Sequence, residues 1–214
     1  MSLKAVIFDL DGVLTDTAEL HYKSWVRLMA EEEMPFSRER NEQLRGATRY
    51  QSLALLFAGH VVSPEQQAEL LERKNRYFFD LLEEARLLPG IAPLLAELKA
   101  AGIPLAVGSA SQNARPVLEV LGVTAHFAAI LDGTLGLPPK PAPDMFLVAA
   151  QALGVAPGNC VVVEDAERGI DAALAGGFAT IGIGPAARVG HAHLRLGDTS
   201  GLTMAVLREA LVKR

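Results

Sequence analysis

The chain has 214 residues, of which 50% are hydrophobic and 21% are charged, and its formal net charge at pH 7 is -5. This composition supplies a full apolar core and excludes a disordered chain, and the length suits one large domain or one domain with a smaller insert. Lysine and arginine are scattered rather than clustered. This argues against a nucleic-acid partner, because phosphate backbones select a basic surface.

Cysteine content and hydropathy indicate the compartment. The single cysteine, Cys160, cannot form a disulfide within the chain, which fits a reducing environment. No stretch approaches the ~18 apolar residues needed to cross a bilayer. The first apolar run is too short for a signal peptide, and acidic residues follow it at once. We therefore expect a cytoplasmic protein with no membrane partner, and a monomer is the working expectation.

The first predicted element is a continuous apolar run at residues 5–10 that ends in acidic residues, which is typical of a buried strand in a parallel sheet. Residues 15–86 then contain no strand candidate. Their patterns predict about four helices, at residues 18–33, 38–44, 50–58 and 64–85. Ser63 followed by Pro64 is a typical N-cap and first-turn pair for the last of them.

After this helical stretch, strands and helices alternate. Strand candidates lie at residues 103–107, 127–131 (the weakest), 160–163 and 179–183. Helical patterns lie at residues 91–101, 114–122, 144–153 and 167–176, and a short final helix lies at 202–212. Such alternation predicts an α/β fold with a doubly wound, Rossmann-like parallel sheet. We expect a core domain of residues 1–14 and 87–214, and an inserted all-helical cap domain of residues 15–86.

Polar residues follow the predicted strands at the points where ligands bind in open α/β sheets, beyond the carboxyl ends. They are Asp9, Asp11, Ser109, Lys140, Glu164 and Asp165. Four carboxylates in one crevice are costly without a cation. Oxygen ligands without histidine or cysteine favour Mg²⁺ over zinc, and their small number favours it over calcium. Lys140 and the Ser109 hydroxyl supply donors that a phosphoryl group requires.

The spacing of Asp9 and Asp11 allows two roles in phosphoryl transfer. Two carboxylates at spacing 2 beyond an extended strand lie on the same side. One can attack phosphorus while the other moves protons to and from the leaving or entering oxygen. Gly12 permits a tight backbone turn beside a ligand.

Each of these residues also has an ordinary structural explanation. Asp-Gly is a common turn, and a lysine between prolines, such as Lys140, is usually a solvated loop residue. Ser109 and the Glu164–Asp165 pair have the chemistry of helix caps. Their joint occurrence at consecutive strand ends of one sheet favours the functional interpretation.

In this order, the residues resemble the haloacid dehalogenase superfamily over nearly the whole chain. Residues 8–13 (FDLDGV) resemble its first motif, Ser109 its second, Lys140 its third and Glu164–Asp165 its fourth. The resemblance implies that Asp9 is the nucleophile and Asp11 the general acid/base. It also implies that Asp9, Asp165 and the Asp11 carbonyl bind Mg²⁺, with Glu164 supporting or joining them, and that a helical cap follows the first motif.

Within this superfamily, the segments 15–25, 41–52, 73–75, 109–113 and 140–144 resemble the β-phosphoglucomutase family. On this resemblance Thr17 and His21 align Asp11 with the sugar, and Lys74 contributes from the cap. A second phosphate would be held by Arg49, Ser111 and Asn113. The expected substrate-binding residues are completed by Trp25, Gly46, Ser52 and Ala110, together with Ser109 and Lys140. His191 and His193 are expected at the surface.

Three functions follow from the resemblance and from the residues. The leading expectation is an isomerase that interconverts β-D-glucose 1-phosphate and D-glucose 6-phosphate through β-glucose 1,6-bisphosphate and phospho-Asp9. A Mg²⁺-dependent phosphatase of a small sugar phosphate is the main alternative, because the core motifs are shared. A non-catalytic phosphosugar-binding protein is the third. One position departs from the pattern, since Gln112 stands where the family often has lysine.

Overall fold

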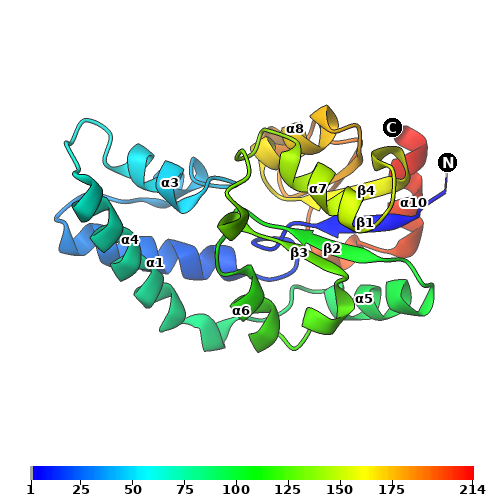
Figure 1. Ribbon diagram of the computed structural model, residues 1–214, viewed down its shortest axis with the longest axis horizontal. Coiled ribbons are helices and arrows are strands. Elements are labelled where there is room, and N and C mark those ends of the chain that lie inside the picture. Colours follow the sequence, from blue (N-terminus) through cyan, green and yellow to red (C-terminus); the bar gives the residue numbers. More distant parts are fainter. Residues whose placement is uncertain (1) are drawn as a thin grey trace.

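The computed structural model describes residues 2–214. Its centre is a six-stranded sheet in the order β3-β2-β1-β4-β5-β6, with every neighbouring pair parallel (Figure 1). The strands are β1 (Ala5–Phe8), β2 (Leu105–Gly108), β3 (Ala129–Leu131), β4 (Cys160–Glu164), β5 (Ala179–Ile183) and β6 (Leu194–Leu196). The predicted α/β fold is confirmed. Met1, which the expected core range includes, lies outside the described residues.

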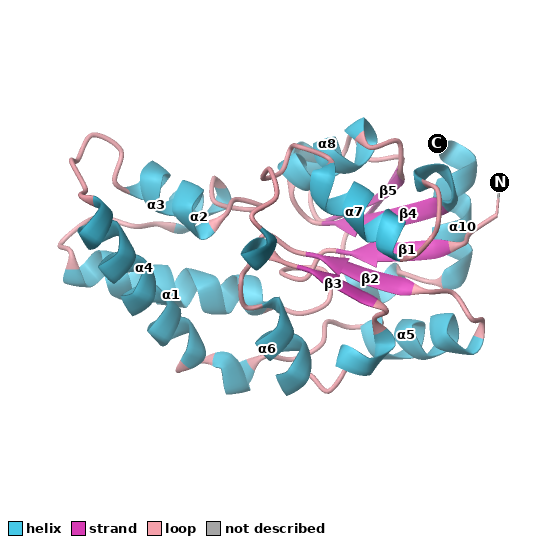
Figure 2. Cartoon of the chain, in the orientation of Figure 1, coloured by secondary structure: helices cyan, strands magenta, loops and turns pink. Residues whose placement is uncertain are grey.

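Helices cover both faces of this sheet (Figure 2). They are α5 (Ile91–Ala100), α6 (Ala114–Val120), α7 (Asp144–Ala152), α8 (Glu167–Ala175), α9 (Ala186–Val189) and α10 (Met204–Lys213). In β1, Val6 and Phe8 pack in the layer with α5, α6 and α10, whereas Ala5 and Ile7 pack in the layer with α7 and α8. Because successive strand residues face opposite sides, a strand covered on both faces must be apolar throughout.

The segment between β1 and α5 is helical and has a hydrophobic cluster of its own. Its helices are α1 (Thr17–Glu31), α2 (Arg38–Glu42), α3 (Arg49–Leu56) and α4 (Pro64–Phe79). Trp25 and Leu28 of α1 pack with Leu53 of α3 and Leu70 of α4 in this cluster. In Figure 1 these helices lie beyond the end of the sheet, clear of its two faces.

Local capping sets where two of these helices begin. Thr48 Oγ1 accepts a hydrogen bond from the backbone N–H of Gln51, and Gln51 Oε1 accepts one from the backbone N–H of Thr48, so that α3 begins at Arg49. Ser63 and Gln66 form the same capping box at the start of α4. Such reciprocal caps satisfy donors that the first turn of a helix otherwise leaves unpaired.

The two chain connections to this helical segment lie side by side. Thr15 pairs with Leu87 as an isolated antiparallel bridge, and its hydroxyl donates to the carbonyl of Arg86 at 2.7 Å. The segment therefore leaves and rejoins the sheet at one point. We propose that residues 15–86 form a cap domain on a core of residues 1–14 and 87–214.

Element boundaries differ from expectation mainly at helix ends and in the C-terminal tail. The helix predicted over residues 64–85 stops at Phe79, and a separate 3-10 turn covers Leu82–Glu84. Neither α9 nor β6 was predicted. The edge strand β6 has three residues that are all at least partly exposed, so backbone pairing with β5 rather than an apolar run defines it.

The expectation of surface histidines holds for only one of the two. His191 is exposed and pairs with Asp171 at 3.0 Å. His193 is partly buried, because its ring Nδ1 accepts from the backbone N–H of Thr180 on β5 at 3.2 Å. Residue type alone does not reveal this contact, which depends on β6 lying beside β5.

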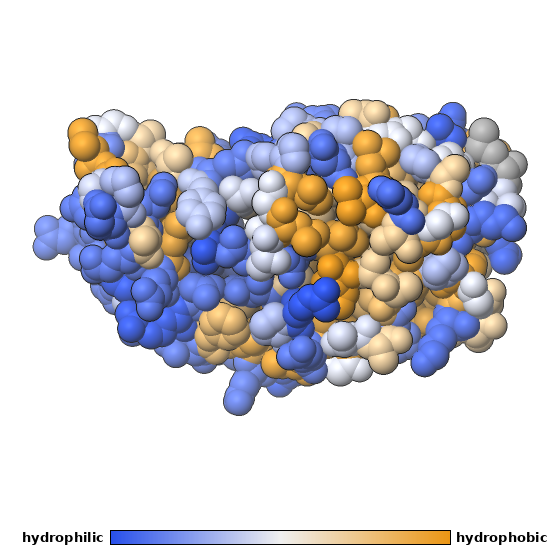
Figure 3. Space-filling model, in the orientation of Figure 1, coloured by the Kyte–Doolittle hydropathy of each residue, from blue (hydrophilic) through white to orange (hydrophobic). Residues whose placement is uncertain are grey.

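The outer surface is uneven in hydropathy. In Figure 3 polar residues cover most of the helical segment, and hydrophobic residues gather over the region of α7. Leu135 and Leu147 are exposed in this part of the core. Among residues 2–214, no helix combines the length and apolar character that crossing a membrane requires.

Candidate active site

The two central strands bring the predicted carboxylates together. Phe8 of β1 is in register with Val163 of β4, and the backbone N–H of Asp9 donates to the Val163 carbonyl at 2.9 Å. Asp9 and Asp165 therefore leave adjacent strand ends, and both are buried. Gly12, at φ 86°, allows close approach, because a Cβ there would lie 2.3 Å from Asp165 Oδ2.

Lys140 is the buried cation of this cluster. Its Nζ donates to Asp9 Oδ1 at 2.6 Å, to Glu164 Oε1 at 2.5 Å and to the Gly108 carbonyl at 3.1 Å. Burial raises the pKa of Asp9 well above its ordinary value, and the Lys140 ammonium opposes that rise. The Lys140 ammonium therefore favours the anionic form of Asp9, against the effect of burial.

Hydrogen bonds order the loop after β2. The backbone N–H of Ser111 donates to Ser109 Oγ at 3.1 Å, and the backbone N–H of Asn113 donates to Ser111 Oγ at 3.1 Å. Across to the helical segment, Asn113 Nδ2 donates to Asn75 Oδ1 of α4 at 2.6 Å. Gln112, which stands where the β-phosphoglucomutase family often has lysine, donates to the Gly133 carbonyl at 3.3 Å. This loop therefore carries polar groups that reach both parts of the molecule.

Asp11 heads a chain of polar groups that crosses into the helical segment. Thr17 Oγ1 donates to Asp11 Oδ1 at 2.5 Å, and His21 Nε2 lies 3.7 Å from the same oxygen. His21 Nδ1 lies 2.5 Å from Lys74 Nζ. Burial lowers the pKa of His21 well below its ordinary value and that of Lys74 to about 7. Burial also raises the pKa of Asp11, while the Thr17 hydrogen bond opposes that rise.

A cavity of about 120 Å³ lies between the sheet edge and the helical segment. Its walls include most predicted residues: Asp9, Asp11, His21, Trp25, Gly46, Arg49, Ser52, Lys74, Ala110, Ser111, Asn113, Glu164 and Asp165. Arg49 opens α3 here, and its Nε is buried without a hydrogen-bond partner within the described part of the chain. An unpaired buried donor is costly unless a ligand completes it, so Arg49 is suited to an anion in this cavity.

Three predicted residues lie behind the cavity wall rather than on it. Thr17, Ser109 and Lys140 are buried and are not among the lining residues. Thr17 contacts Asp11, and Lys140 contacts Asp9, so each acts on the cavity through a carboxylate. Ser109 contacts the backbone of Ser111.

The acidic residues suit a hard divalent cation. Across residues 2–214, no three histidine, cysteine, aspartate or glutamate side chains form a ready metal cage. Glu164 is committed to Lys140 and, through Oε2, to the backbone N–H of Ala166 at 2.7 Å. Carboxylate oxygens of Asp9 and Asp165 leave adjacent strand ends, and such oxygen donors, few in number, suit Mg²⁺ because this ion keeps several waters.

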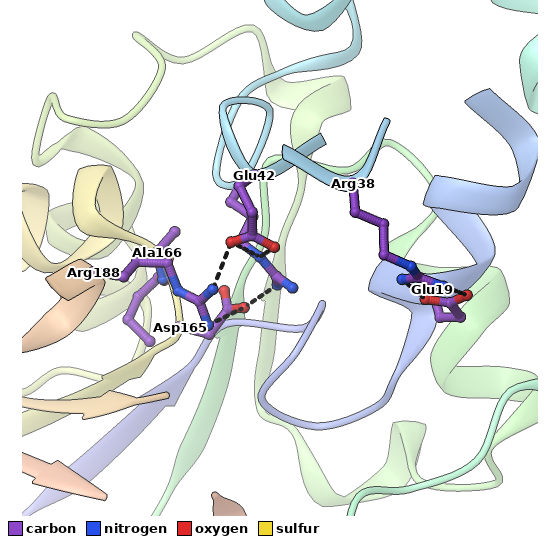
Figure 4. Close-up of polar contacts among 8 residues, drawn as sticks. Glu19, Arg38, Glu42, Asp165, Ala166 and Arg188 are labelled. Atoms are coloured by element: carbon purple, nitrogen blue, oxygen red, sulfur yellow. Dashed lines mark hydrogen bonds and ion pairs between the residues drawn. The ribbon is translucent and has the colours of Figure 1, made fainter. Parts of the chain in front are cut away.

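Two arginines at this site were assigned no role from the sequence (Figure 4). Arg45, between α2 and α3, donates to Asp165 Oδ2 at 2.5 Å, and Arg188 of α9 donates to Glu42 Oε2 at 2.7 Å. Burial and Glu164 raise the pKa of Asp165, and Arg45 opposes that rise. Arg45 lies in a segment already singled out by its motif, whereas nothing in the tail sequence marked Arg188.

Comparison with known proteins agrees with this geometry. The model of the haloacid dehalogenase-like hydrolase family matches residues 3–177. The β-phosphoglucomutase of Bacillus subtilis is 42% identical over 97% of this chain and 95% of that enzyme. A crystal structure of β-phosphoglucomutase from Clostridium difficile superposes with a TM-score of 0.93 at 35% identity, covering 99% of this chain and 98% of that one.

A hydrolase is also similar. The fructose-1-phosphate phosphatase YqaB of Escherichia coli is 30% identical over 83% of this chain and 95% of that enzyme. The family model covers most of the chain, and each relative is matched over nearly its whole length. The chain belongs to the haloacid dehalogenase-like hydrolase family.

Proposed function

We propose that this protein interconverts β-D-glucose 1-phosphate and D-glucose 6-phosphate through β-glucose 1,6-bisphosphate and a phospho-aspartate at Asp9. The observation that carries the proposal is a cavity lined by Asp9 from the sheet edge and by Arg49 from the helical segment. Lys140 contacts Asp9 from behind the wall, and the Nε of Arg49 is buried and unpaired within the described part of the chain. A bisphosphate intermediate needs a second anion site besides the one at Asp9, and Arg49 can supply it, whereas hydrolysis of a monophosphate needs one site.

The residues support a balanced transfer. The bond between phosphorus and the Asp9 carboxylate breaks as the sugar 6-hydroxyl oxygen bonds to phosphorus, and the hydroxyl proton passes to Asp11. After the bisphosphate turns over, Asp9 attacks the phosphate on C1, and Asp11 returns a proton to the departing sugar oxygen. The contacts of Asp11 with Thr17 and His21 hold its carboxylate for both steps.

Mg²⁺ would be held by Asp9, Asp165 and the Asp11 carbonyl, and would supply charge neutralisation around the transferring phosphoryl group. Lys140 and the Ser109 hydroxyl would complete the phosphate contacts. At the other end of the cavity Arg49, Ser111 and Asn113 would hold the second phosphate, while Trp25, Gly46, Ser52 and Ala110 line the space for the sugar. His21 and Lys74 would tie the acid–base group to the cap.

Exclusion of water decides between transfer and hydrolysis. An aspartyl-phosphate open to solvent hydrolyses, so a mutase must close its cap before the sugar hydroxyl attacks. The contact between Asn113 and Asn75 joins the sheet edge to α4 beside the cavity. It is suited to holding the cap against the core.

A coupled assay tests the proposal. β-Glucose 1-phosphate, Mg²⁺ and a trace of glucose 1,6-bisphosphate are supplied, and glucose 6-phosphate and free phosphate are followed in parallel. We expect glucose 6-phosphate without matching free phosphate. Free phosphate with little isomerisation would instead identify a sugar-phosphate phosphatase, in line with the similarity to the E. coli enzyme.

A variant pair locates the second phosphate. Arg49→Gln should weaken use of the bisphosphate by about a hundredfold, because a buried charge-assisted contact is lost. Arg38→Gln, a cap arginine paired with Glu19 outside the cavity, is the matched control. Equal activity of both variants with the bisphosphate would remove the main support for a mutase.

A further inference from the structure

A four-residue ion cluster joins the cap to the core beside the candidate metal site (Figure 4). Glu42 and Arg45 come from the cap, and Asp165 and Arg188 come from the core. Glu42 accepts from Arg45 Nε at 3.1 Å and from Arg188 Nη1 at 2.7 Å, so its carboxylate bridges the two guanidinium groups. Two carboxylates balance two cations, and the cluster is neutral without any ion.

The oxygen of Asp165 that Arg45 contacts is the one facing the nucleophile loop. Arg45 Nη1 donates to Oδ2 at 2.5 Å, and the same Oδ2 lies where a Cβ on Gly12 would be 2.3 Å away. Gly12 follows Asp11 directly and lies three residues after Asp9. Arg45 therefore places positive charge on the Asp165 oxygen that lies beside the loop carrying Asp9.

The Arg45–Asp165 contact is more buried than the Arg38–Glu19 pair of the cap. The Asp165 side chain is 7% exposed and that of Arg45 is 24% exposed, whereas the Arg38 side chain, paired with Glu19, is 65% exposed. Exposed pairs contribute little, but a pair that is largely removed from water interacts more strongly. Occupation of Asp165 by Arg45 is thus a substantial obstacle to a second cation at the same carboxylate.

We propose that Arg45 is a tethered counter-ion that competes with Mg²⁺ for Asp165, so that metal binding releases the Glu42–Arg45 segment of the cap from the core. This rests on the proposed function in one respect, the assignment of Asp165 as a metal ligand. Without the metal, Arg45 offsets the charge of the acidic cluster. With the metal bound, two cations at one carboxylate repel, and the cap contact weakens. By reciprocity, a cap contact that holds Asp165 lowers the affinity for Mg²⁺ by the same factor.

Titration of the protein with MgCl₂, followed by calorimetry, measures the competition directly. Arg45→Gln removes the charge at nearly constant size and should lower the Kd for Mg²⁺ by about tenfold. Arg45→Lys keeps a cation and should restore part of the wild-type Kd. Arg38→Gln is the matched control and should leave the Kd within about twofold. Circular dichroism checks that each variant is folded.

Hydrogen exchange supplies a readout independent of affinity. In the wild type, amides of residues 38–46 should exchange faster when MgCl₂ is added, since the segment leaves Asp165. In Arg45→Gln they should exchange fast with or without the metal. Exchange that slows on addition of MgCl₂ in the wild type would overturn the proposal.

Asp165→Asn separates the two possible failures. If this variant binds Mg²⁺ at least tenfold more weakly while Arg45→Gln binds like the wild type, Asp165 is a ligand and the competition is disproved. If Asp165→Asn binds as tightly as the wild type, Asp165 is not a metal ligand, and both the metal assignment and the counter-ion role are overturned. Tighter binding in Arg45→Gln, together with weaker binding in Asp165→Asn, supports both.

Discussion

Lys74 and Lys140 show how burial gives the same residue type two different properties. Both ammonium groups are almost fully buried, with 5% and 2% of the residue exposed. Lys140 has two carboxylate partners at 2.6 and 2.5 Å, which keep it charged. Lys74 faces His21 and the rings of Trp25 and Phe78, and burial lowers its pKa from the ordinary 10.5 to about 7. Desolvation dominates in Lys74, and ion pairing offsets it in Lys140.

The lowered pKa of Lys74 predicts that burial of this side chain reduces the free energy of unfolding by an amount that depends on pH. Between about pH 7 and 10.5 the unfolded chain binds a proton that the folded chain does not, so the free energy of unfolding rises with pH in this window. Lys74→Met should therefore stabilise the protein by up to about 5 kcal/mol near pH 7, and this gain should vanish as the pH approaches 10.5. Urea unfolding at several pH values measures it. Lys99→Met, at an exposed position of α5, is the control; a difference constant with pH would contradict the prediction.

Substitution of Lys140 should destabilise the protein, whereas substitution of Lys74 should stabilise it. Lys140→Met leaves Asp9 and Glu164 buried without their cation, which should cost about 3–5 kcal/mol of unfolding free energy and abolish turnover. Burial raises the pKa of Asp9, so the folded variant takes up a proton more readily than the unfolded chain, and its stability should fall as pH rises. Unfolding at pH 5 and pH 8 tests this. Equal losses at the two pH values would mean that no carboxylate is left uncompensated.

At the scale of elements, the start of helix α3 positions Arg49, the candidate phosphate ligand of the cap. Thr48 caps α3, whose first residue is Arg49, and Ser63 caps α4 in the same way. Only the first of these helices begins at the cavity, since Gly46, Ala47 and Arg49 line it. The capping boxes of α3 and α4 are chemically alike, but only that of α3 lies next to cavity-lining residues.

The capping boxes supply a matched pair of variants. Thr48→Ala and Ser63→Ala should each lower the free energy of unfolding by about 1 kcal/mol, because one first-turn donor loses its acceptor. Only Thr48→Ala should also raise the concentration of glucose 1,6-bisphosphate needed for half-maximal activity, since α3 then frays at Arg49. Thermal unfolding and bisphosphate titration measure the two effects. An equal change in bisphosphate requirement for both variants would show that the start of α3 does not position Arg49.

At the scale of the whole molecule, the cavity exists only because the helical segment covers the sheet edge. The sheet contributes the carboxylates, and the cap contributes His21, Arg49 and Lys74. Polar contacts across the boundary include the Asn113–Asn75 hydrogen bond and the ion pairs of Arg45 with Asp165 and of Glu42 with Arg188. Near the chain connections, Leu20 and Phe78 of the cap also pack into the hydrophobic cluster of the core.

Breaking the Asn113–Asn75 hydrogen bond should let water compete with the sugar hydroxyl for the aspartyl-phosphate. Asn75→Ala removes the 2.6 Å contact with Asn113, and we expect the ratio of free phosphate to glucose 6-phosphate to rise severalfold while the protein stays folded. Parallel measurement of both products gives the ratio. Glu72→Ala, an exposed change on the same helix, should leave it unaltered. An unchanged ratio in Asn75→Ala would show that this contact does not seal the cavity.

The amino-acid sequence determined the α/β fold and the residues at the strand ends. Apolar runs such as Ala5–Phe8 and Cys160–Glu164 are readable because burial on both faces of a parallel sheet requires them. Asp9, Asp11 and Asp165 follow those runs directly, so local sequence places them at the common edge. The C-terminal tail was not readable, because β6 depends on pairing with β5 rather than on its own pattern.

Only the tertiary structure decided which charges meet. Lys140 lies 131 positions from Asp9, and Arg45 lies 120 positions from Asp165, yet each pair is in contact. Composition and periodicity describe what a segment buries and not what another segment presents to it. The lowered pKa of Lys74, the unpaired Nε of Arg49 and the ion cluster of Glu42, Arg45, Asp165 and Arg188 therefore arise from packing between segments far apart in the chain, because desolvation and Coulomb interactions depend on distance in space and not along the chain.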